Sequence, residues 1–131
     1  MPIAIEKRPD DAAIIFVALP PIILPDDQIA QLNEVVLFKQ EMGRHVYRIL
    51  DLRGILMDFD DLLSGMEYER GIPGGANDPD VTTYFIGTTA LVQFGVKTLQ
   101  DYPHLYGKTD VHLVTSLEEA IAEVQVRLAQ R

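Results

Sequence analysis

The sequence predicts an α/β fold with the order β-β-α-β-α-β-α-β-α, in which a five-stranded mixed sheet carries packed helices. Short runs rich in branched and aromatic residues alternate with longer runs whose apolar residues recur at helical spacing. Glycine, proline and aspartate separate these runs. The first two strands are joined by a short turn and are expected to form an antiparallel hairpin, whereas helical connections predict parallel pairing of the others.

The five expected strands are short and rich in valine, isoleucine, leucine and aromatic residues. They cover residues 3–7, 14–19, 46–52, 81–86 and 111–114. The turn Pro9-Asp10-Asp11 joins the first two. The longest loop, residues 71–80, is dense in glycine and proline, and it is the segment for which we expect mobility.

The first two helices have recognisable residues at their ends. The first is expected to begin at Pro25-Asp26-Asp27 with an aspartate as its N-cap, and to end at Gly43. Its face toward the sheet is expected to consist of Ile29, Leu32, Val36 and Gln40. The second helix is expected over residues 59–70, beginning at the aspartates and ending before Gly71.

The last two helices also begin at recognisable turns. The third follows Gly87-Thr88-Thr89 and ends at Tyr102-Pro103. The final helix begins with the capping box of Ser116 and Glu119. The expected inward residues are Leu91, Phe94 and Thr98 or Leu99 in the third helix, and Leu117, Ala120, Ile121, Val124 and Leu128 in the last.

Length and charge narrow the class of protein. The 131 residues are expected to form a single domain, 1–131. The net charge of −9 and the lack of a basic run argue against nucleic-acid binding. The lack of cysteine excludes disulfides and thiolate metal sites. The apolar segment 12–24 is too short to span a membrane, so we interpret it as a buried strand of a cytoplasmic protein without membrane insertion.

Three short segments carry a family resemblance. Leu50-Asp51-Leu52-Arg53-Gly54-Ile55 ends a strand, Met57-Asp58-Phe59-Asp60-Asp61-Leu62 follows it, and residues 114–120 lead from the last strand into a helix. With the element order, these segments resemble the STAS superfamily and the closely related family similar to the sporulation anti-sigma factor antagonist. The resemblance implies a STAS-like, bacterial-type regulatory domain that binds a protein partner. Asp60 occupies the position of the phosphorylated serine, so a serine switch is not expected here.

The carboxyl ends of the third and fourth strands carry the candidate site, because open α/β sheets bind ligands at this edge. If these two strands lie side by side and parallel, the loops that follow them meet. The candidate ligand-binding residues are Asp51, Arg53, Asp58, Asp60, Gly87 and Thr88. Arg53 is expected to anchor an anion, and the turn at Thr88 is expected to receive it.

Each of these residues also has a purely structural interpretation. Asp51 is suited to bonding loop amides or pairing with Arg53. The acids at positions 58, 60 and 61 are suited to capping a helix as well as to binding Mg²⁺. The turn Gly87-Thr88-Thr89 is suited to a threonine N-cap.

We therefore expect a non-enzymatic domain that binds a protein partner, a second copy of itself or a small anionic ligand at the carboxyl edge of the sheet. No catalytic residue, metal site or cofactor is expected. One alternative is a Mg²⁺-assisted enzyme acting on a phosphorylated small molecule through Asp51 and Asp58. Another is the binding of an apolar ligand or lipid, which requires a cavity between the sheet and its helices.

Overall fold

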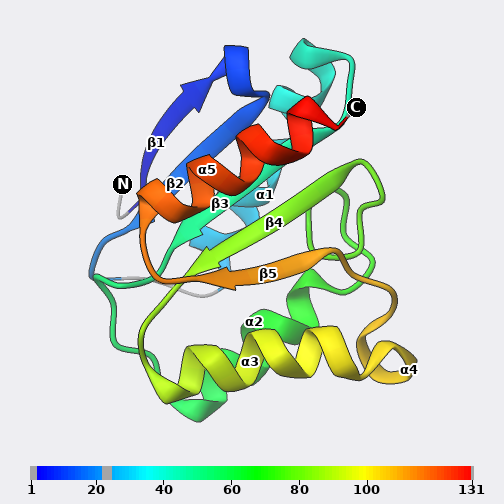
Figure 1. The fold of residues 1–131 in the computed structure, drawn as a ribbon. Coiled ribbons are helices and arrows are strands. Elements are labelled where there is room, and N and C mark those ends of the chain that lie inside the picture. The colour runs from blue at the N-terminus through cyan, green and yellow to red at the C-terminus, as the bar shows by residue number, and fades with distance from the viewer. Residues whose placement is uncertain (1–2, 22–24, 131) are drawn as a thin grey trace.

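The computed structural model describes residues 3–21 and 25–130 and has the α/β fold that the sequence predicts. One sheet holds five strands in the order β1-β2-β3-β4-β5 (Figure 1). They are β1 (Ile3–Arg8), β2 (Ala13–Ala18), β3 (Val46–Asp51), β4 (Val81–Ile86) and β5 (Val111–Val114). β1 and β2 are antiparallel and the other neighbouring pairs are parallel, which confirms the expected pairing.

The helices are those expected, with one short addition between the third helix and the last strand. They are α1 (Asp26–Met42), α2 (Phe59–Glu69), α3 (Ala90–Asp101), α4 (Pro103–Tyr106) and α5 (Leu117–Ala129). The turn between β1 and β2 forms the short 3-10 helix η1 (Pro9–Asp11). Within the described ranges, no helix is both long and apolar enough to cross a lipid bilayer.

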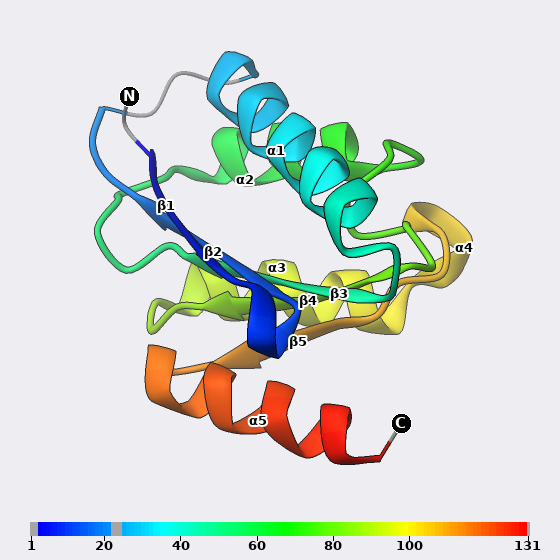
Figure 2. The same cartoon turned by 90° about the horizontal axis from the view of Figure 1, so that it is seen from above.

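The strand order explains how the helices divide between the two faces. From β2 to β5, each helical connection moves one strand further in the same direction along the sheet. Right-handed crossovers of this kind place their helices on one face. Accordingly, α1, α2 and α3 pack on one face of the sheet, and α5 packs alone on the other. Figure 2 shows α5 on one side and α1 and α2 on the opposite side.

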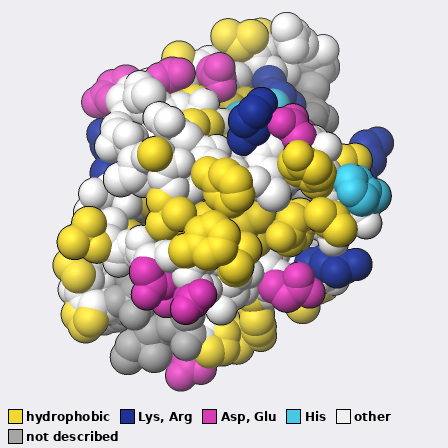
Figure 3. Space-filling view, turned by 90° about the horizontal axis from the view of Figure 1, so that it is seen from below, with side chains coloured by type: hydrophobic (Ala, Val, Ile, Leu, Met, Phe, Trp, Pro, Cys, Tyr) yellow, Lys and Arg dark blue, Asp and Glu magenta, His cyan; other side chains and the backbone are white. Residues whose placement is uncertain are grey.

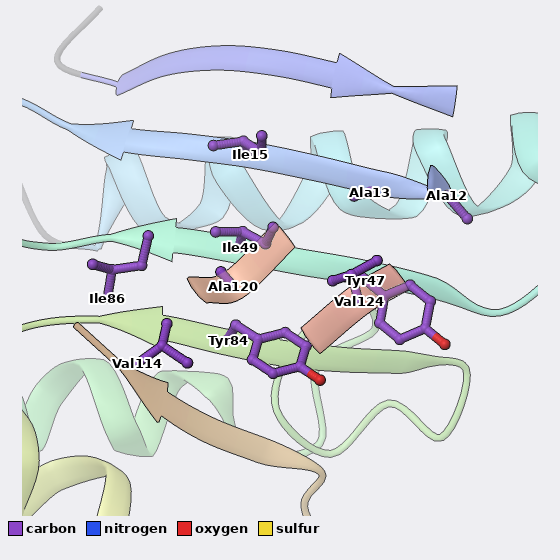
Figure 4. Packing of buried hydrophobic residues seen from close by; sticks show 10 residues of the cluster. All are labelled: Ala12, Ala13, Ile15, Tyr47, Ile49, Tyr84, Ile86, Val114, Ala120 and Val124. Atoms are coloured by element: carbon purple, nitrogen blue, oxygen red, sulfur yellow. The ribbon is translucent and has the colours of Figure 1, made fainter. Parts of the chain in front are cut away.

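The α5 face has a close-packed core. The inward residues of α5, Ala120 and Val124, form one cluster with buried residues of β2, β3, β4 and β5, and Leu117, Ile121 and Leu128 border this cluster as expected. Tyr47 and Tyr84 lie in neighbouring strands with their hydroxyl oxygens pointing toward the same end (Figure 4).

Polar contacts are present at both ends of α5. At its amino end, Ser116 Oγ accepts the amide of Glu119 at 3.1 Å, which confirms the N-cap. The reciprocal half of the expected capping box differs, because the Glu119 carboxylate accepts from Thr115 instead of Ser116. Toward the other end, Arg127 donates to Asp110 Oδ2 at 3.3 Å. Asp110 also accepts from the Thr82 hydroxyl at 2.6 Å.

Two details predicted for α1 are wrong. Its N-cap is Pro25, and Asp26 and Asp27 are already the first helical residues. The stripe of buried residues is also rotated from the expected one, since it consists of Gln31, Leu32, Val35 and Phe38. Gln31 is polar although it is buried, so the spacing of apolar residues alone does not identify this stripe. The end of α1 is as expected, because Gly43 adopts φ +61° and closes the helix.

The inward face predicted for α3 is also largely wrong. Phe94 is 50% exposed, and the buried stripe is Val92, Gly95, Val96 and Leu99. Gly95 has no side chain, so a pattern of apolar side chains in the sequence does not reveal that this position is buried. Its lack of a side chain serves packing here, because a Cβ atom on Gly95 would lie 2.7 Å from Cδ1 of Leu62 on α2.

The loop of residues 71–80 is tied down along its length. Asp78 accepts hydrogen bonds from Lys39 Nζ at 2.7 Å and from the Gly74 amide at 2.8 Å. Asn77 donates to the carbonyls of Tyr106 and Lys108 at 2.8 and 2.9 Å. These bonds connect the loop to α1 on one side and to the segment before β5 on the other. The loop has a structural role that its composition did not indicate.

Candidate functional site

Asp51 and Arg53 form a closed pair at the carboxyl end of β3. Arg53 Nε donates to Asp51 Oδ1 at 3.0 Å, a terminal guanidinium nitrogen donates to Oδ2 at 2.8 Å, and the Arg53 amide adds a third bond at 3.0 Å. Burial alone would raise the pKa of Asp51, but the hydrogen bonds and charge of Arg53 outweigh it and hold that pKa below its usual range. The cation expected to anchor an anion is thus engaged by its own neighbour.

Asp58 and Asp60 belong to the first turn of α2. Asp58 is the N-cap: its Oδ1 accepts the Asp61 amide at 2.8 Å, and Asp61 Oδ2 accepts the Asp58 amide at 3.3 Å. Asp60 is exposed in the same turn. In the part of the chain that the structure describes, no group of three or more histidines and acids is arranged to hold a metal ion. Asp58 therefore caps α2, as its structural interpretation predicts.

Gly87 and Thr88 lead from β4 into α3. The Gly87 amide donates to the Val114 carbonyl at 3.2 Å, which continues the sheet. The N-cap of α3 is Thr89, whose hydroxyl oxygen accepts the Val92 amide at 3.2 Å. Thr88 is exposed. The threonine N-cap, which is the structural interpretation of this turn, is therefore present at Thr89.

The geometric condition for a shared site is met, yet the candidate residues do not converge on one pocket. β3 and β4 are adjacent and parallel, and Asp51 pairs with Ile86 in their register. Asp51, however, has the same orientation along β3 as Tyr47 and Ile49, which face α5. The connections that follow β3 and β4 both lead to helices on the opposite face, so the sheet has no topological switch point between these two strands.

A cavity lies instead on the face covered by α1, α2 and α3. Its volume is about 600 Å³, within the range of roughly 300–1,000 Å³ that small-molecule sites occupy. Its walls are mainly apolar, and their larger side chains are Leu50, Leu52, Leu62, Met66, Phe85, Val96 and Leu99. The segment from Gly54 to Met57 contributes as well. Leu56 lines the cavity and is 99% exposed, so this segment marks where the cavity reaches the surface.

One part of the cavity wall is polar, and it is built around Arg48. Arg48 has no exposed surface, and its ion-pair partner Glu69 contributes to the wall together with Gln28 and Gln31. Arg48 Nε donates to the Thr83 hydroxyl at 3.0 Å, and one terminal nitrogen donates to Gln31 Oε1 at 3.2 Å. This network satisfies the buried guanidinium, as a charge in an apolar interior requires.

The side-chain amide of Gln28 has a definite orientation. Its nitrogen donates to the Gly65 carbonyl at 2.9 Å and to Glu69 Oε2 at 3.1 Å. Turning the amide over would bring its oxygen against these two acceptors, so the observed orientation is the favourable one. The oxygen Oε1 is buried and has no hydrogen-bond donor in the structure described.

The surface between α2 and α3 is apolar beside the cavity. Phe59 and Phe94 are each 50% exposed, and their ring centroids lie 6.0 Å apart. We call this pair the α2–α3 surface. Figure 3 shows hydrophobic side chains gathered near the middle of this face of the molecule. Two large aromatic side chains therefore lie against each other at the surface of the molecule.

One residue of β3 indicates the polar wall from the sequence alone. Arg48 lies inside a strand whose other residues are apolar, at a position that alternates with Tyr47 and Ile49. In a central strand with both faces covered, such a charge must be buried and must have a partner. That partner, Glu69, lies at the end of the next helix. The cavity itself had no comparable signal, because it depends on how closely three helices approach the sheet.

Fold and site define an α/β domain with an apolar cavity beneath its helices. No protein-family model, curated protein or solved structure matches the chain. The functional argument therefore rests on the cavity and its surroundings.

Proposed function

We propose that this domain binds a small apolar ligand in the cavity between the sheet and α1, α2 and α3. The observation that carries the proposal is a cavity of about 600 Å³ with largely apolar walls and one polar region. Protein interiors are normally close-packed, so a space of this size requires a reason. Binding an apolar molecule there would remove apolar surface of both partners from water.

The chemistry of the walls supports binding more than catalysis. Among the described residues that line the cavity there is no histidine, lysine, serine or threonine to act on a substrate. Two of its acids are already engaged, because Glu69 pairs with Arg48 and Asp61 completes the cap of α2. The anionic ligand expected from the sequence has less support, since Arg53 is held by Asp51.

Calorimetric titration with octan-1-ol tests the proposal. We expect saturable binding with one site per chain. Val96 is 4% exposed and lines the cavity, so Val96→Phe is expected to fill part of the space and weaken binding at least tenfold. Val126→Phe is the matched control, because Val126 on α5 is 57% exposed and lies away from the cavity. Equal binding by wild type and both variants would contradict the proposal.

A second candidate function is association with another protein chain through the α2–α3 surface. It is favoured by the half-exposed Phe59 and Phe94 and agrees with the partner-binding role that the STAS resemblance implies. We propose a second copy of this chain as the occupant. Two copies, each with a net charge of −9, repel each other, so salt that screens this repulsion should favour the dimer.

Sedimentation equilibrium at low and high salt tests the second candidate. We expect a dimer whose population grows with ionic strength. Phe94→Ser is expected to abolish it, whereas Val126→Ser, at a similarly exposed position on α5, should leave it unchanged. A wild-type chain that remains a monomer at both salt concentrations would contradict self-association through this surface.

A further inference from the structure

We propose that protonation of His112 releases the carboxyl end of α5 from the sheet. His112 lies on β5, and its atom Nε2 contacts two residues at once: Asp110 Oδ1 and a terminal guanidinium nitrogen of Arg127, each at 2.7 Å. Arg127 belongs to the last turn of α5. The proposal concerns the face of the sheet opposite the cavity and does not depend on ligand binding.

The two contacts of His112 Nε2 are mutually exclusive. An imidazole nitrogen carries either a lone pair or a hydrogen, so it either accepts or donates. As an acceptor, Nε2 takes a hydrogen bond from Arg127, which requires the hydrogen of the neutral ring to be on Nδ1. As a donor, it bonds to Asp110, and its hydrogen then faces the N–H groups of Arg127. Protonated His112 carries hydrogens on both nitrogens, so it cannot accept from Arg127.

Asp110 is held in place by a second set of hydrogen bonds. The Thr82 hydroxyl donates to Asp110 Oδ2 at 2.6 Å and lies 2.8 Å from His45 Nε2. Because the single hydrogen of the hydroxyl goes to the carboxylate, His45 must donate, which it does in both its neutral and its protonated form. Burial alone would raise the pKa of Asp110, but hydrogen bonds from Thr82 and His112 outweigh it and lower that pKa. Asp110 therefore stays charged where histidines titrate, between about pH 5 and 8.

Protonation of His112 removes the strongest attachment of Arg127 to the sheet. Arg127 loses the acceptor Nε2 and meets the positive charge of the imidazolium instead. Its remaining bond to Asp110 Oδ2 is 3.3 Å long and shares that oxygen with Thr82. Glu123 is an alternative partner, because it is exposed and lies four residues earlier on α5, the spacing at which opposite charges pair on a helix.

Tyr84 on β4 completes the surroundings of His112. Its ring stacks on the imidazole with the centroids 5.2 Å apart, and the guanidinium carbon of Arg127 lies 5.9 Å from the centroid of the Tyr84 ring. Burial raises the pKa of Tyr84 to about 12, so its hydroxyl is neutral where histidines titrate. The Tyr84 ring therefore adds no charge to the switch, and its contact with Arg127 reports whether α5 is attached.

NMR spectroscopy of the full chain at pH 8 and pH 5 tests the proposal. At pH 8 we expect nuclear Overhauser contacts between the Arg127 side chain and the Tyr84 ring, and a His112 Nε2 chemical shift typical of a lone pair. At pH 5 the shift should be that of an N–H group. The contacts of Arg127 should weaken about fivefold or more, because the proton shifts the population toward the released arrangement. The amides of residues 127–130 should become more mobile in ¹⁵N relaxation over the same pH range.

Two histidine variants identify the group responsible. His112→Gln removes the titrating ring, so the pH dependence of the α5 end should disappear. His104→Gln is the matched control and should behave like the wild type, because His104 is an exposed histidine on α4. The comparison of the wild-type chain at two pH values stands even if His112→Gln folds poorly. Contacts between Arg127 and Tyr84 that are equal at pH 8 and pH 5, or that change equally in His112→Gln, would overturn the proposal.

Discussion

The guanidinium of Arg48 on β3 and the carboxylate of Glu69 at the end of α2 form a buried ion pair that joins the sheet to the helix layer. Glu69→Ala is expected to destabilise the fold by about 3–5 kcal/mol, because it leaves a fully buried cation uncompensated. Unfolding in urea, monitored by circular dichroism, measures this free energy. The double variant Arg48→Met/Glu69→Leu should recover most of it, since apolar replacement of both partners is often neutral. A double variant as unstable as Glu69→Ala would contradict this account.

The attachment of loop 71–80 to α1 should depend on pH through Asp78. Burial alone would raise the pKa of Asp78, but hydrogen bonds from Lys39, Gly74 and Asp80 outweigh it and lower that pKa. A carboxyl whose pKa is lower in the folded than in the unfolded chain stabilises the fold above its unfolded pKa of about 3.9. That stabilisation is lost as the pH falls through the folded value.

Asp78→Asn isolates this contribution from those of other acids. At pH 7 the variant is expected to be less stable by about 2–3 kcal/mol, because it loses charge-assisted hydrogen bonds. The difference from wild type should shrink as the pH falls below about 3.9, because Asp78 of the unfolded wild-type chain then takes up a proton while Asp78 of the folded chain is still charged. Urea unfolding at several pH values measures the difference. A gap that is constant down to pH 3 would show that the charge of Asp78 is unimportant.

Gly74 gives a prediction about close packing of the same loop. It adopts φ +83°, and a Cβ atom there would lie 2.9 Å from the Leu32 carbonyl oxygen and 3.2 Å from Val35 Cβ. Gly74→Ala is therefore expected to cost more than the roughly 1–2 kcal/mol of the left-handed conformation alone. Gly43→Ala is the matched control, since Gly43 has φ +61° and no atom within 4 Å of the added Cβ. Equal losses in thermal or urea unfolding would contradict the contact.

Chain length should control ligand affinity if the walls of the cavity are in contact with the ligand. Each added methylene is worth about 0.8 kcal/mol when it is fully buried, or about fourfold in affinity. Hexan-1-ol, octan-1-ol and decan-1-ol should therefore bind with affinities that rise about 16-fold per step until the cavity is full. Calorimetric titration gives the three constants. A flat series would indicate that the alkyl chain remains in water.

Local sequence features were sufficient to predict the fold. The strands β4 and β5 have the predicted bounds because each is an apolar run between turn residues. The position of α5 followed from its cap at Ser116 and its regular stripe. The buried faces of α1 and α3 were harder to predict from the sequence. Gln31 and Gly95 lie at inward positions, but neither has the apolar side chain by which an inward face is recognised.

The candidate site was harder to predict than the fold. The adjacency of β3 and β4 was correctly expected, but the direction in which Asp51 points depends on which face each helix covers. The cavity depends on tertiary packing, since its walls come from four strands and from three helices. Arg48 was the one local indication of the polar wall, because its burial follows from the apolar strand around it.

A methyl-detected NMR titration with octan-1-ol tests the central claim most directly. The cavity hypothesis predicts saturable shifts for methyl groups of Leu52, Leu62, Val92 and Val96, with little change at Val114 and Val124 on the α5 face. Shifts confined to exposed methyl groups, or equal shifts on both faces of the sheet, would contradict binding in the cavity.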